Sequence, residues 1–478
     1  MPTPDPGIDP ADLETCLRVL AAVDGLPVEH PDAVAVRRAT ASVFKSVKLR
    51  RRADRRAEIL VRDGAVTAAT ATGAPGRIDD ETRGLPLASG TTATSAGRLL
   101  RPRGCYVCKR RYHDVDAFYH QLCPACAARN RARREARTDL TGRRALLTGG
   151  RAKIGMYIAL RLLRDGADTT ITTRFPRDAA RRFAGMDDSP DWVDRLRIVG
   201  VDLRDPAQVL ALADATAGRG PLDILINNAA QTVRRSPAAY APLAAAEAAP
   251  LPPGPLPEIV VLADRHADAG LGNGRDHPHW APTPHALTAL ALAPASASPA
   301  LVPAGRALDA GGLVPDPHPV NSWIHRVDEV DPVELLEVQL CNVTAPFILV
   351  GRLRPALAAA PTGRAYVVNV SAMEGQLNRG YKGPGHPHTN MAKAALNMLT
   401  RTSAADLRAD GILMTSVDTG WITDERPHPT RMRLAGDGFH APLDLVDGAA
   451  RVYDPIVRGE AGEDVYGCFL KDYDPAPW

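Results

Sequence analysis

The sequence is poor in aromatic residues and has no long uninterrupted apolar segment. Phe, Trp and Tyr make up 5% of its 478 residues, and it contains no run of about eighteen apolar residues, the length that a membrane-spanning helix needs. The first ten residues, MPTPDPGIDP, lack the basic start and apolar stretch of a signal peptide. We therefore expect a cytoplasmic protein without a membrane partner.

Neither sign of charge is in strong excess. The chain has 58 basic and 55 acidic residues, a formal net charge of +3, so we expect no nucleic-acid partner attracted by overall charge. The stretch KSVKLRRRADRR at 45–56 is a local exception. It could contact phosphates, and a helix with a solvated charged face is the alternative.

The length of the chain predicts more than one domain. Residues 1–98 begin with a helical pattern and end in a stretch, 64–98, whose composition is typical of a linker. A small cysteine-containing module follows at 99–140, and the largest part is 141–478. Within that part, residues 231–325 are dominated by Ala, Pro, Gly and His, and only EIVVLAD at 258–264 is typical of a strand. We expect most of this insertion to lie outside the core.

Cysteine is scarce but clustered. Three of the seven cysteines are isolated, and the other four form two Cys-x-x-Cys turns separated by fourteen residues: Cys105, Cys108, Cys123 and Cys126. Four thiolates at this spacing can close tetrahedrally around one Zn²⁺. We predict a closed, zinc-ribbon-like structural site that performs no metal catalysis, with buried reduced thiols as the alternative. His113 and His120 are possible substitute ligands.

A basic segment, RNRARREAR at 129–137, follows the second cysteine pair. Together with the zinc module it could bind a protein or a nucleic acid. A solvated helix that leads into the next domain is the alternative.

Seven short apolar segments after residue 144 are typical of strands and are separated by helical patterns. They are ALLTG (145–149), ADTTITTRF (167–175), LRIVGVDL (196–203), LDILINNA (222–229), AYVVNVSA (365–372), ILMTSVDTG (412–420) and VYGCFL (465–470). This alternation predicts an α/β fold with a doubly wound parallel sheet of the Rossmann type.

A glycine-rich turn, TGGRAKIG at 148–155, lies between the first predicted strand and its helix. Amides at the N-terminus of a helix in this position face the pyrophosphate of a dinucleotide. Further motifs follow in order: Asp202-Leu203, Asn228-Ala229, Asn342 on a long helix, Ser371 at the end of the fifth strand, and Lys393 on the helix after it. In these motifs and their spacing, residues 141–478 resemble the short-chain dehydrogenase/reductase family, with the insertion set aside.

The resemblance implies an NAD(P)-dependent oxidoreductase that acts on a small carbonyl or alcohol and forms a homo-oligomer. It implies that Ser371 orients the carbonyl, Lys393 holds the nicotinamide ribose and Asn342 supports a water path. The expected cofactor-binding residues also include the charged residues of the phosphate turn and of the next strand. The full set is Gly149, Arg151, Lys153, Ile154, Gly155, Arg174, Asp202, Leu203, Asn228, Ala229, Lys393 and Thr423. The segment 418–423 is expected beside the nicotinamide.

The chain departs from the family pattern in its phosphate turn. Lys153 stands where the family has its middle glycine. About twenty positions further on, Thr173 and Arg174 replace the acid that would hold a free ribose 2′-hydroxyl. An arginine at this place suits a 2′-phosphate, so we predict NADP as the cofactor, with NAD as the alternative.

The family's Tyr-x-x-x-Lys motif reads Thr389 to Lys393, without the tyrosine. An aliphatic hydroxyl is a far weaker acid than a phenol, so Thr389 cannot replace it efficiently. Other donors in the preceding loop are His386, His388 and Tyr381; we prefer Tyr381 for its phenol, with His388 second. Two functions follow: an NADP-dependent oxidoreductase with an altered proton donor, or a catalytically degenerate NAD(P)-binding sensor or scaffold whose zinc module recruits a protein partner.

Overall fold

The structure is a computed structural model that describes residues 7–75, 77, 94–235, 237–262, 311–423 and 425–478. Its internal contacts divide the chain into two compact units. Unit 1 comprises Met1–Val66 with Leu99–Arg101, and unit 2 comprises Thr67–Arg98 with Pro102–Trp478.

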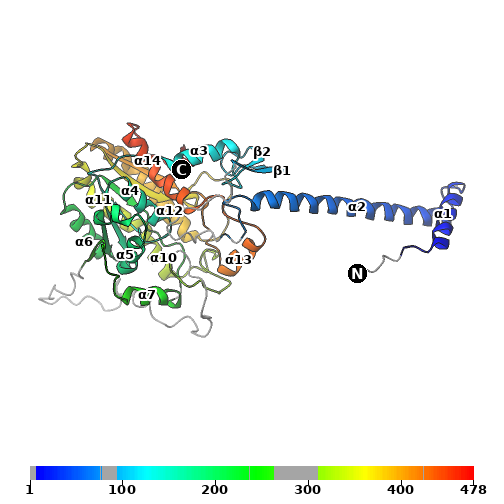
Figure 1. The fold of residues 1–478 in the computed structure, drawn as a ribbon, viewed down its shortest axis with the longest axis horizontal. Helices are drawn as coiled ribbons and strands as arrows, with labels where there is room; N and C mark the ends of the chain where they lie inside the picture. The colour runs from blue at the N-terminus through cyan, green and yellow to red at the C-terminus, as the bar shows by residue number, and fades with distance from the viewer. Residues whose placement is uncertain (1–6, 76, 78–93, 236, 263–310, 424) are drawn as a thin grey trace. The chain divides into compact units, whose positions relative to one another are not determined.

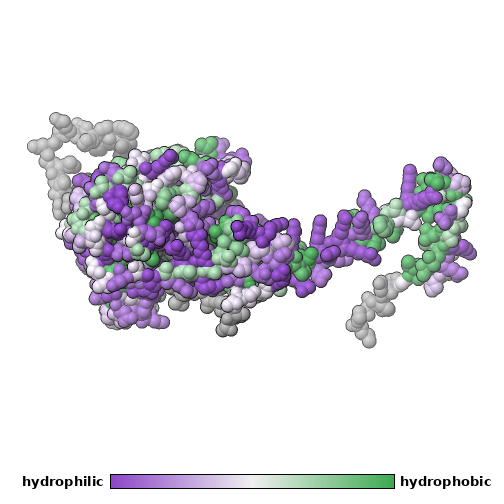
Figure 2. Space-filling model, turned by 90° about the horizontal axis from the view of Figure 1, so that it is seen from above, coloured by the Kyte–Doolittle hydropathy of each residue, from purple (hydrophilic) through white to green (hydrophobic). Residues whose placement is uncertain are grey.

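Unit 1 is helical, as predicted. It contains α1 (Pro10–Asp24) and most of α2 (Pro31–Ala68). The Asp9 side chain caps α1 by accepting hydrogen bonds from two backbone amides of the first turn. The basic residues of 45–56 are exposed along α2, and hydrophilic side chains cover much of this helix in Figure 2. Their exposure fits the solvated charged face that we considered.

The predicted linker 64–98 is partly an ordered, buried segment of unit 2. The Thr72 hydroxyl donates to the Phe118 carbonyl at 2.9 Å. The Arg77 guanidinium is buried and donates to the carbonyls of Ala441 at 2.9 Å and Leu443 at 2.7 Å. The expectation of a simple linker is therefore wrong for 67–75 and 77, while residues 76 and 78–93 lie outside the described residues.

The cysteine-containing module consists of an antiparallel pair, β1 (Ser95–Gly104) and β2 (Arg111–Asp116), followed by α3 (Pro124–Glu135). Two basic side chains of α3 form ion pairs with the C-terminal helix α14 (Leu445–Glu460) and the turn before it. Arg134 lies 2.6 Å from Asp444 and 3.0 Å from Asp447, and Arg133 lies 2.7 Å from Asp454. The module is thus attached to the larger domain through these buried carboxylates.

A nine-stranded sheet forms the centre of unit 2 (Figure 1), in the order β11-β10-β9-β8-β6-β3-β4-β5-β7. The seven predicted strands are all present: β3 (Arg144–Leu147), β4 (Asp168–Thr173), β5 (Leu196–Gly200), β6 (Ile224–Asn227), β8 (Ala365–Ser371), β9 (Ile412–Asp418) and β10 (Phe469–Lys471). Neighbouring strands are parallel except for the edge strand β11 (Asp474–Ala476), which pairs antiparallel with β10. β8 and β9 are buried along their whole length, as expected for central parallel strands.

Helices cover both faces of this sheet, which confirms the doubly wound fold. The described helices are α4 (Lys153–Arg164), α5 (Pro176–Ala184), α6 (Pro206–Ala217), α7 (Ala241–Ala248), α10 (Pro332–Gln339), α11 (Ala345–Ala358), α12 (Pro387–Ala409), α13 (His428–Gly436) and α14. One apolar cluster joins the sheet to α4, α5 and α14, and a second joins it to α6, α11 and α12. Each amphipathic helix therefore buries its apolar stripe against one face.

A continuous helix from Pro332 to Ala358 is long and apolar enough to cross a membrane by length and composition alone. Its C-terminal part, α11, packs against α6 and against β6 and β8. Leu349 and Leu353 of α11 are fully buried in the second apolar cluster. These contacts account for its apolar composition.

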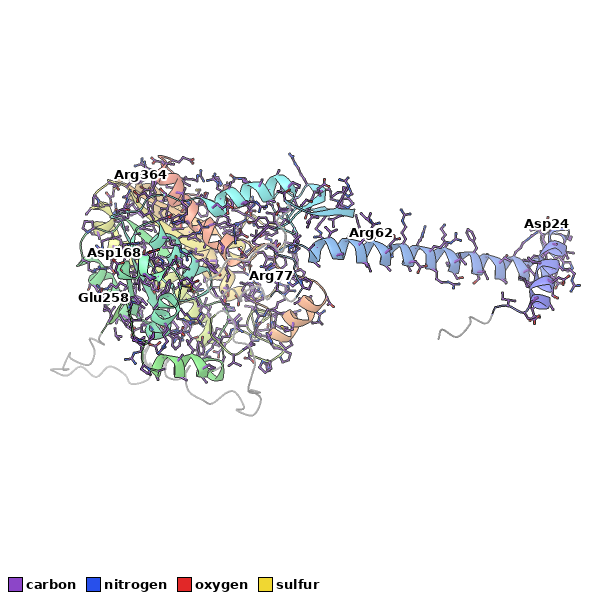
Figure 3. The ribbon with its side chains drawn as sticks, in the orientation of Figure 1. Asp24, Arg62, Arg77, Asp168, Glu258 and Arg364 are labelled. Carbon is purple, nitrogen blue, oxygen red and sulfur yellow. The ribbon has the colours of Figure 1, made fainter. Side chains whose placement is uncertain are left out.

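Part of the predicted insertion belongs to the fold. EIVVLAD does contribute a strand, β7 (Glu258–Val261), which extends the sheet beside β5. Glu258 and Asp168, which begin β7 and β4, lie on the same side of unit 2 in Figure 3. Glu247 of α7 accepts hydrogen bonds from the amides of Arg177 and Asp178, both at 2.9 Å, at the start of α5. Few of the described residues of 231–325 are buried, which agrees with the expectation that most of this segment lies outside the core, although β7 joins the edge of the sheet. Residues 236 and 263–310 lie outside the described residues.

Candidate active site

A cleft of about 990 Å³ opens at the carboxyl ends of the parallel strands. This is where open α/β sheets place their ligands. The twelve residues that the sequence suggested for cofactor binding come from six elements and loops, and all of them line this cleft.

The phosphate turn requires glycine at two positions. Gly149 has φ +73°, and a Cβ added there would lie 2.9 Å from the Cα of Ala229. A Cβ on Gly155 would lie 2.0 Å from the Gly149 carbonyl oxygen. The Asn228 side-chain amide donates to the carbonyls of Thr148 and Gly149 at 3.0 and 3.1 Å, which holds the turn against the end of β6.

Lys153 adopts the conformation that favours glycine, with φ +53°. A non-glycine residue pays roughly 1–2 kcal/mol in this left-handed region. Lys153 therefore adopts a backbone conformation that suits glycine and adds a positive charge to the wall of the cleft.

Arg174 marks one end of the cleft. Its guanidinium lies 5.6 Å from the ring centroid of Phe175 and 5.3 Å from that of Tyr240, and it donates to the Tyr240 hydroxyl at 3.2 Å. It forms no ion pair with any carboxylate of the described residues, whereas Arg151 lies 2.6 Å from Asp178. A cation that the protein leaves without a carboxylate suits a phosphate. Tyr240 belongs to the insertion, and no sequence motif pointed to it.

Asp202 and its neighbours form the wall beside Arg174. Burial alone would raise the pKa of Asp202, but hydrogen bonds from the Arg204 guanidinium outweigh it and hold that pKa below its usual value. Arg204 also lies 2.9 Å from Glu337. Asp202 is therefore ionised, and the Arg204 guanidinium balances its negative charge.

Ser371 and Lys393 stand together at the other end. Ser371 is the last residue of β8 and lies beside Asp418 of β9 in the strand register. Its Oγ is buried and has no hydrogen-bond partner among the described residues. The Lys393 ammonium donates to the Val370 carbonyl at 2.7 Å, and burial lowers its pKa to about 8. A hydroxyl without a partner beside a cation can orient an oxygen of a ligand.

Asn342 lies behind the wall of the cleft. It sits in a π-helical turn, Leu340–Thr344, between α10 and α11, a deviation that is frequent at functional sites. Its Oδ1 accepts from the Gln231 amide at 2.8 Å and its Nδ2 donates to the Gln231 carbonyl at 2.9 Å. Gln231 lines the cleft and Asn342 does not, so the structure places Asn342 as a support for Gln231.

The predicted proton donors differ in their exposure and in whether they line the cleft. Thr389 is 1% exposed, with its hydroxyl buried and without a hydrogen-bond partner among the described residues. Tyr381, which we preferred, is 76% exposed and does not line the cleft, because its loop carries the side chain outward. The preference for Tyr381 is therefore corrected. His388 is buried 4.0 Å from Glu334 and does not line the cleft either.

His386 is the donor candidate that does line the cleft. It caps α12 with φ +43°, and its ring stacks on Trp323 with centroids 3.9 Å apart and planes 8° apart. Its Nδ1 lies 2.8 Å from the Trp323 carbonyl oxygen. The carbonyl can only accept, so Nδ1 donates this hydrogen bond and Nε2 is the ring nitrogen left for another partner. Trp323 comes from the insertion, which is why sequence reasoning could not rank His386 first.

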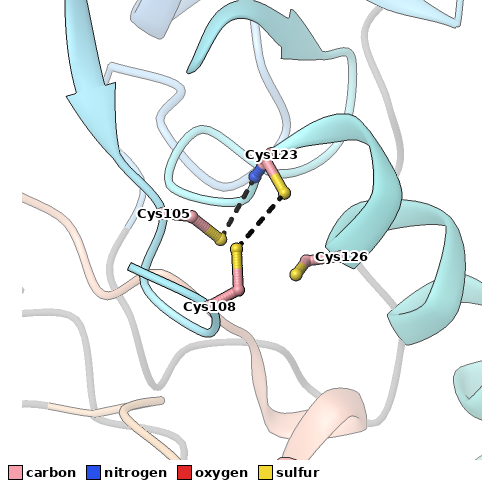
Figure 4. A group of neighbouring side chains, drawn as sticks. All are labelled: Cys105, Cys108, Cys123 and Cys126. Atoms are coloured by element: carbon pink, nitrogen blue, oxygen red, sulfur yellow. Dashed lines mark hydrogen bonds between the residues drawn. The ribbon is translucent and has the colours of Figure 1, made fainter. Parts of the chain in front are cut away.

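The cysteine cluster has the geometry of a metal site (Figure 4). Its four sulfur atoms all lie within 4.8 Å of one another, and those of Cys108 and Cys123 are 3.7 Å apart. Four sulfurs about 2.3 Å from one ion have edges of similar length. The donor set therefore fits zinc.

The two substitute ligands are not part of this cluster. His120 is buried with Nδ1 2.8 Å from the Thr72 hydroxyl and Nε2 3.0 Å from the Gln121 side chain. Burial lowers the pKa of His120 to about 3, so the ring is neutral and serves packing.

The same module reaches the cleft. Tyr106 and Lys109, which lie within and next to the first Cys-x-x-Cys turn, line the cleft together with the loop after β9. The Trp421 amide donates to the Tyr106 hydroxyl oxygen at 2.9 Å. Sequence reasoning missed both residues, because nothing in the motif shows which way the turn faces.

Comparisons with known proteins agree with this geometry. Residues 143–247 match the family model described as short chain dehydrogenase. "Uncharacterized protein R665" of Acanthamoeba polyphaga mimivirus is 29% identical over 375 residues, which cover 74% of this chain and 71% of that protein. A "Probable oxidoreductase" of Streptomyces antibioticus is 41% identical over 91 residues, which cover 19% of this chain and 30% of that protein.

Among solved structures, the NADPH-bound carbonyl reductase from chicken fatty liver is 17% identical, with a TM-score of 0.42, and the match covers 71% of this chain and all (100%) of that one. The family match lies on the phosphate turn and on the strands that form the first half of the sheet. The family motifs named above line the cleft, with the exception of Asn342. The Rossmann domain of this chain is therefore similar, over residues 143–247, to the short chain dehydrogenase family.

Proposed function

We propose that this protein is an NADP-dependent oxidoreductase that interconverts a small carbonyl compound and its alcohol. The observation that carries the proposal is one cleft with Arg174 at one end, the glycine turn in the middle, and Ser371 and Lys393 at the other. When bound, the reduced cofactor supplies the hydride for the carbonyl carbon.

Arg174 supports NADP over NAD. Its guanidinium is held by two aromatic rings and forms no ion pair with a carboxylate of the described residues. A 2′-phosphate would gain charge-assisted hydrogen bonds there. Asp202, the carboxylate nearby, is already engaged by Arg204 and is not available for a free 2′-hydroxyl.

Ser371 and Lys393 support chemistry at a carbonyl oxygen. The Ser371 hydroxyl can donate to that oxygen, because no described residue uses it. The Lys393 ammonium lies on the same wall and stabilises the negative charge that develops on the oxygen.

His386 is the proton donor in this proposal. Its Nδ1 donates to the Trp323 carbonyl, so the proton to be transferred is held at Nε2. During reduction the imidazolium gives this proton to the carbonyl oxygen and becomes neutral, and oxidation of the alcohol runs the transfer backwards. An imidazole can both donate and accept a proton at this nitrogen, which suits both directions.

The test is NADPH oxidation with a panel of aldehydes and ketones. We expect His386→Asn to lower kcat about 10²–10⁴-fold and to leave the Kd of NADPH unchanged, because asparagine tolerates a positive φ. Tyr381→Phe is the matched control and should retain full activity, since that side chain is exposed.

Full activity of His386→Asn would disprove the role of this donor. A wild-type protein that binds NADPH and turns over no substrate, with activity gained by Thr389→Tyr, would instead establish the sensor or scaffold function.

We further propose that the cysteine cluster holds one structural zinc. Four thiolates close the site, so no position remains for a substrate. Elemental analysis should find about one zinc per chain, and Cys105→Ser with Cys126→Ser should remove it. A metal-free protein that is fully folded, with freely reactive thiols, would contradict this site.

A further inference from the structure

We propose that the cysteine module forms part of the active-site wall, and that Tyr106 positions the loop Asp418–Thr423 and thereby sets the affinity for the nicotinamide half of the cofactor. The inference rests on the proposed cofactor. It assigns Tyr106 a positioning role, since the contact that it makes is with the loop.

The contact itself joins two distant parts of the chain. The Tyr106 hydroxyl oxygen accepts a hydrogen bond from the Trp421 amide at 2.9 Å, across 315 residues of sequence. Gly420 immediately precedes Trp421 and has φ +78°. A Cβ added to Gly420 would lie 2.7 Å from the Leu443 side chain. The loop is therefore confined on one side by packing, and Tyr106 supplies a polar partner for its backbone.

The position of Tyr106 is fixed by both cysteine turns. Its amide donates to the Gln121 carbonyl, next to the second turn, at 2.8 Å, and the Lys109 amide donates to the Cys105 carbonyl at 3.1 Å. The Cys123 amide donates to the Cys105 sulfur at 3.3 Å. A metal bound by the four sulfurs would join these turns covalently, so Tyr106 is held between two of its ligands.

The module is also anchored below the loop. The Arg451 side chain, from α14, is 1% exposed and donates to the Asn130 side chain of α3 at 2.9 Å. Its Nε lies 3.4 Å from the position of a Cβ on Gly420. Movement of the module would therefore disturb both the hydrogen bond to Trp421 and the packing under Gly420.

The loop belongs to the reacting end of the cleft. Asp418 lies beside Ser371 in the register of β9 and β8, whereas Arg174 follows β4, four strands further along the sheet order. A change at Tyr106 should consequently alter binding of the nicotinamide half and leave the adenosine half unaffected.

The test compares two ligands of the zinc-loaded protein by calorimetry: NADPH, and adenosine 2′,5′-bisphosphate, which lacks the nicotinamide. Tyr106→Phe removes the acceptor for the Trp421 amide and keeps the ring. We expect it to weaken NADPH about three- to tenfold and to leave the bisphosphate unchanged. Tyr112→Phe is the control, because its hydroxyl lies in the same module, donates to the His120 carbonyl at 2.9 Å and does not line the cleft.

Metal removal provides a second measurement. Protein stripped by a chelator should lose NADPH affinity and keep bisphosphate affinity, and added Zn²⁺ should restore NADPH binding. Equal losses for both ligands, or an unchanged NADPH affinity in Tyr106→Phe, would overturn the inference. Absence of turnover in the wild type would count against the proposed function alone, because the binding comparison does not depend on turnover.

Discussion

The two ends of the cleft are built on different principles. The end with Arg174 uses consecutive Rossmann elements, β3 to β5, and adds Tyr240 from the insertion. The end with Ser371 and Lys393 uses β8, α12 and the loop after β9, and adds Tyr106 from the cysteine module. At the first end the Arg174 guanidinium is exposed and can bind an anionic group. At the second end the Lys393 ammonium is buried.

This contrast teaches that the two ends differ in how precisely they must place their groups. Charge attraction at Arg174 tolerates small shifts of position, because Coulomb energy varies gradually with distance. Proton transfer at the other end requires hydrogen-bond geometry. The chain departs from the family pattern at both ends, with Lys153 and Arg174 at the first and Thr389 in place of the tyrosine at the second.

The largest effect should come from Gly155→Ala, which acts on both ends at once. The added Cβ would lie 2.0 Å from the Gly149 carbonyl oxygen, so the phosphate turn must open. We expect the affinities for NADPH and for adenosine 2′,5′-bisphosphate both to fall by about 100-fold or more. Gly351→Ala in α11 is the control, because a Cβ there meets no atom within 4 Å; a normal affinity in Gly155→Ala would refute this account of the turn.

Lys393→Met should disable the reacting end alone. We expect kcat/KM to fall about 10²–10³-fold, with bisphosphate binding unchanged. Because burial lowers the pKa of Lys393 to about 8, the wild type should lose kcat/KM as the pH rises above about 8, where the ammonium is deprotonated. A wild-type profile that stays flat to pH 10 would exclude a role for the charged lysine.

Lys393 should also affect how the stability of the folded protein depends on pH. Its folded-state pKa lies below that of an unfolded chain, so the folded state binds fewer protons between about pH 8 and 10.5. The stabilising contribution of neutral Lys393 therefore grows as the pH rises through this window, and Lys393→Met should be the more stable protein at pH 7. Thermal unfolding of both proteins at pH 7 and pH 9.5 measures this, and a destabilised variant at pH 7 would contradict it.

Arg174→Ala should disable the opposite end. Loss of charge-assisted hydrogen bonds to a 2′-phosphate should weaken NADPH about 10- to 100-fold and leave NADH nearly unchanged. Arg352→Ala, an exposed arginine of α11, is the control for net charge. Equal affinity of the wild type for NADPH and NADH would remove the basis for this prediction.

The smallest effect should come from Tyr240→Phe. The phenylalanine keeps the ring over which the Arg174 guanidinium lies and removes only the hydroxyl that accepts its hydrogen bond at 3.2 Å. We expect about a threefold weaker affinity for NADPH, measured against the same protein's unchanged affinity for NADH. A loss as large as that of Arg174→Ala would mean that Tyr240 contacts the ligand itself.

The sequence by itself determined the local elements of the protein. The seven strands, the glycines at 149 and 155 and the four clustered cysteines could be predicted, because hydrophobic period, turn chemistry and thiol spacing act over a few neighbouring residues. The twelve proposed cofactor residues lie in one cleft for the same reason: parallel strands bring the residues that follow them to one edge of the sheet.

Only the tertiary structure decided what closes that cleft. The contact between Tyr106 and Trp421 spans 315 residues, and Trp323 and Tyr240 come from a segment whose composition suggested a loop. His386 and Tyr381 lie five residues apart, yet one lines the cleft and the other is 76% exposed. Whether a side chain lines the cleft or is exposed depends on packing between distant elements, and this packing produces no periodic pattern in the sequence.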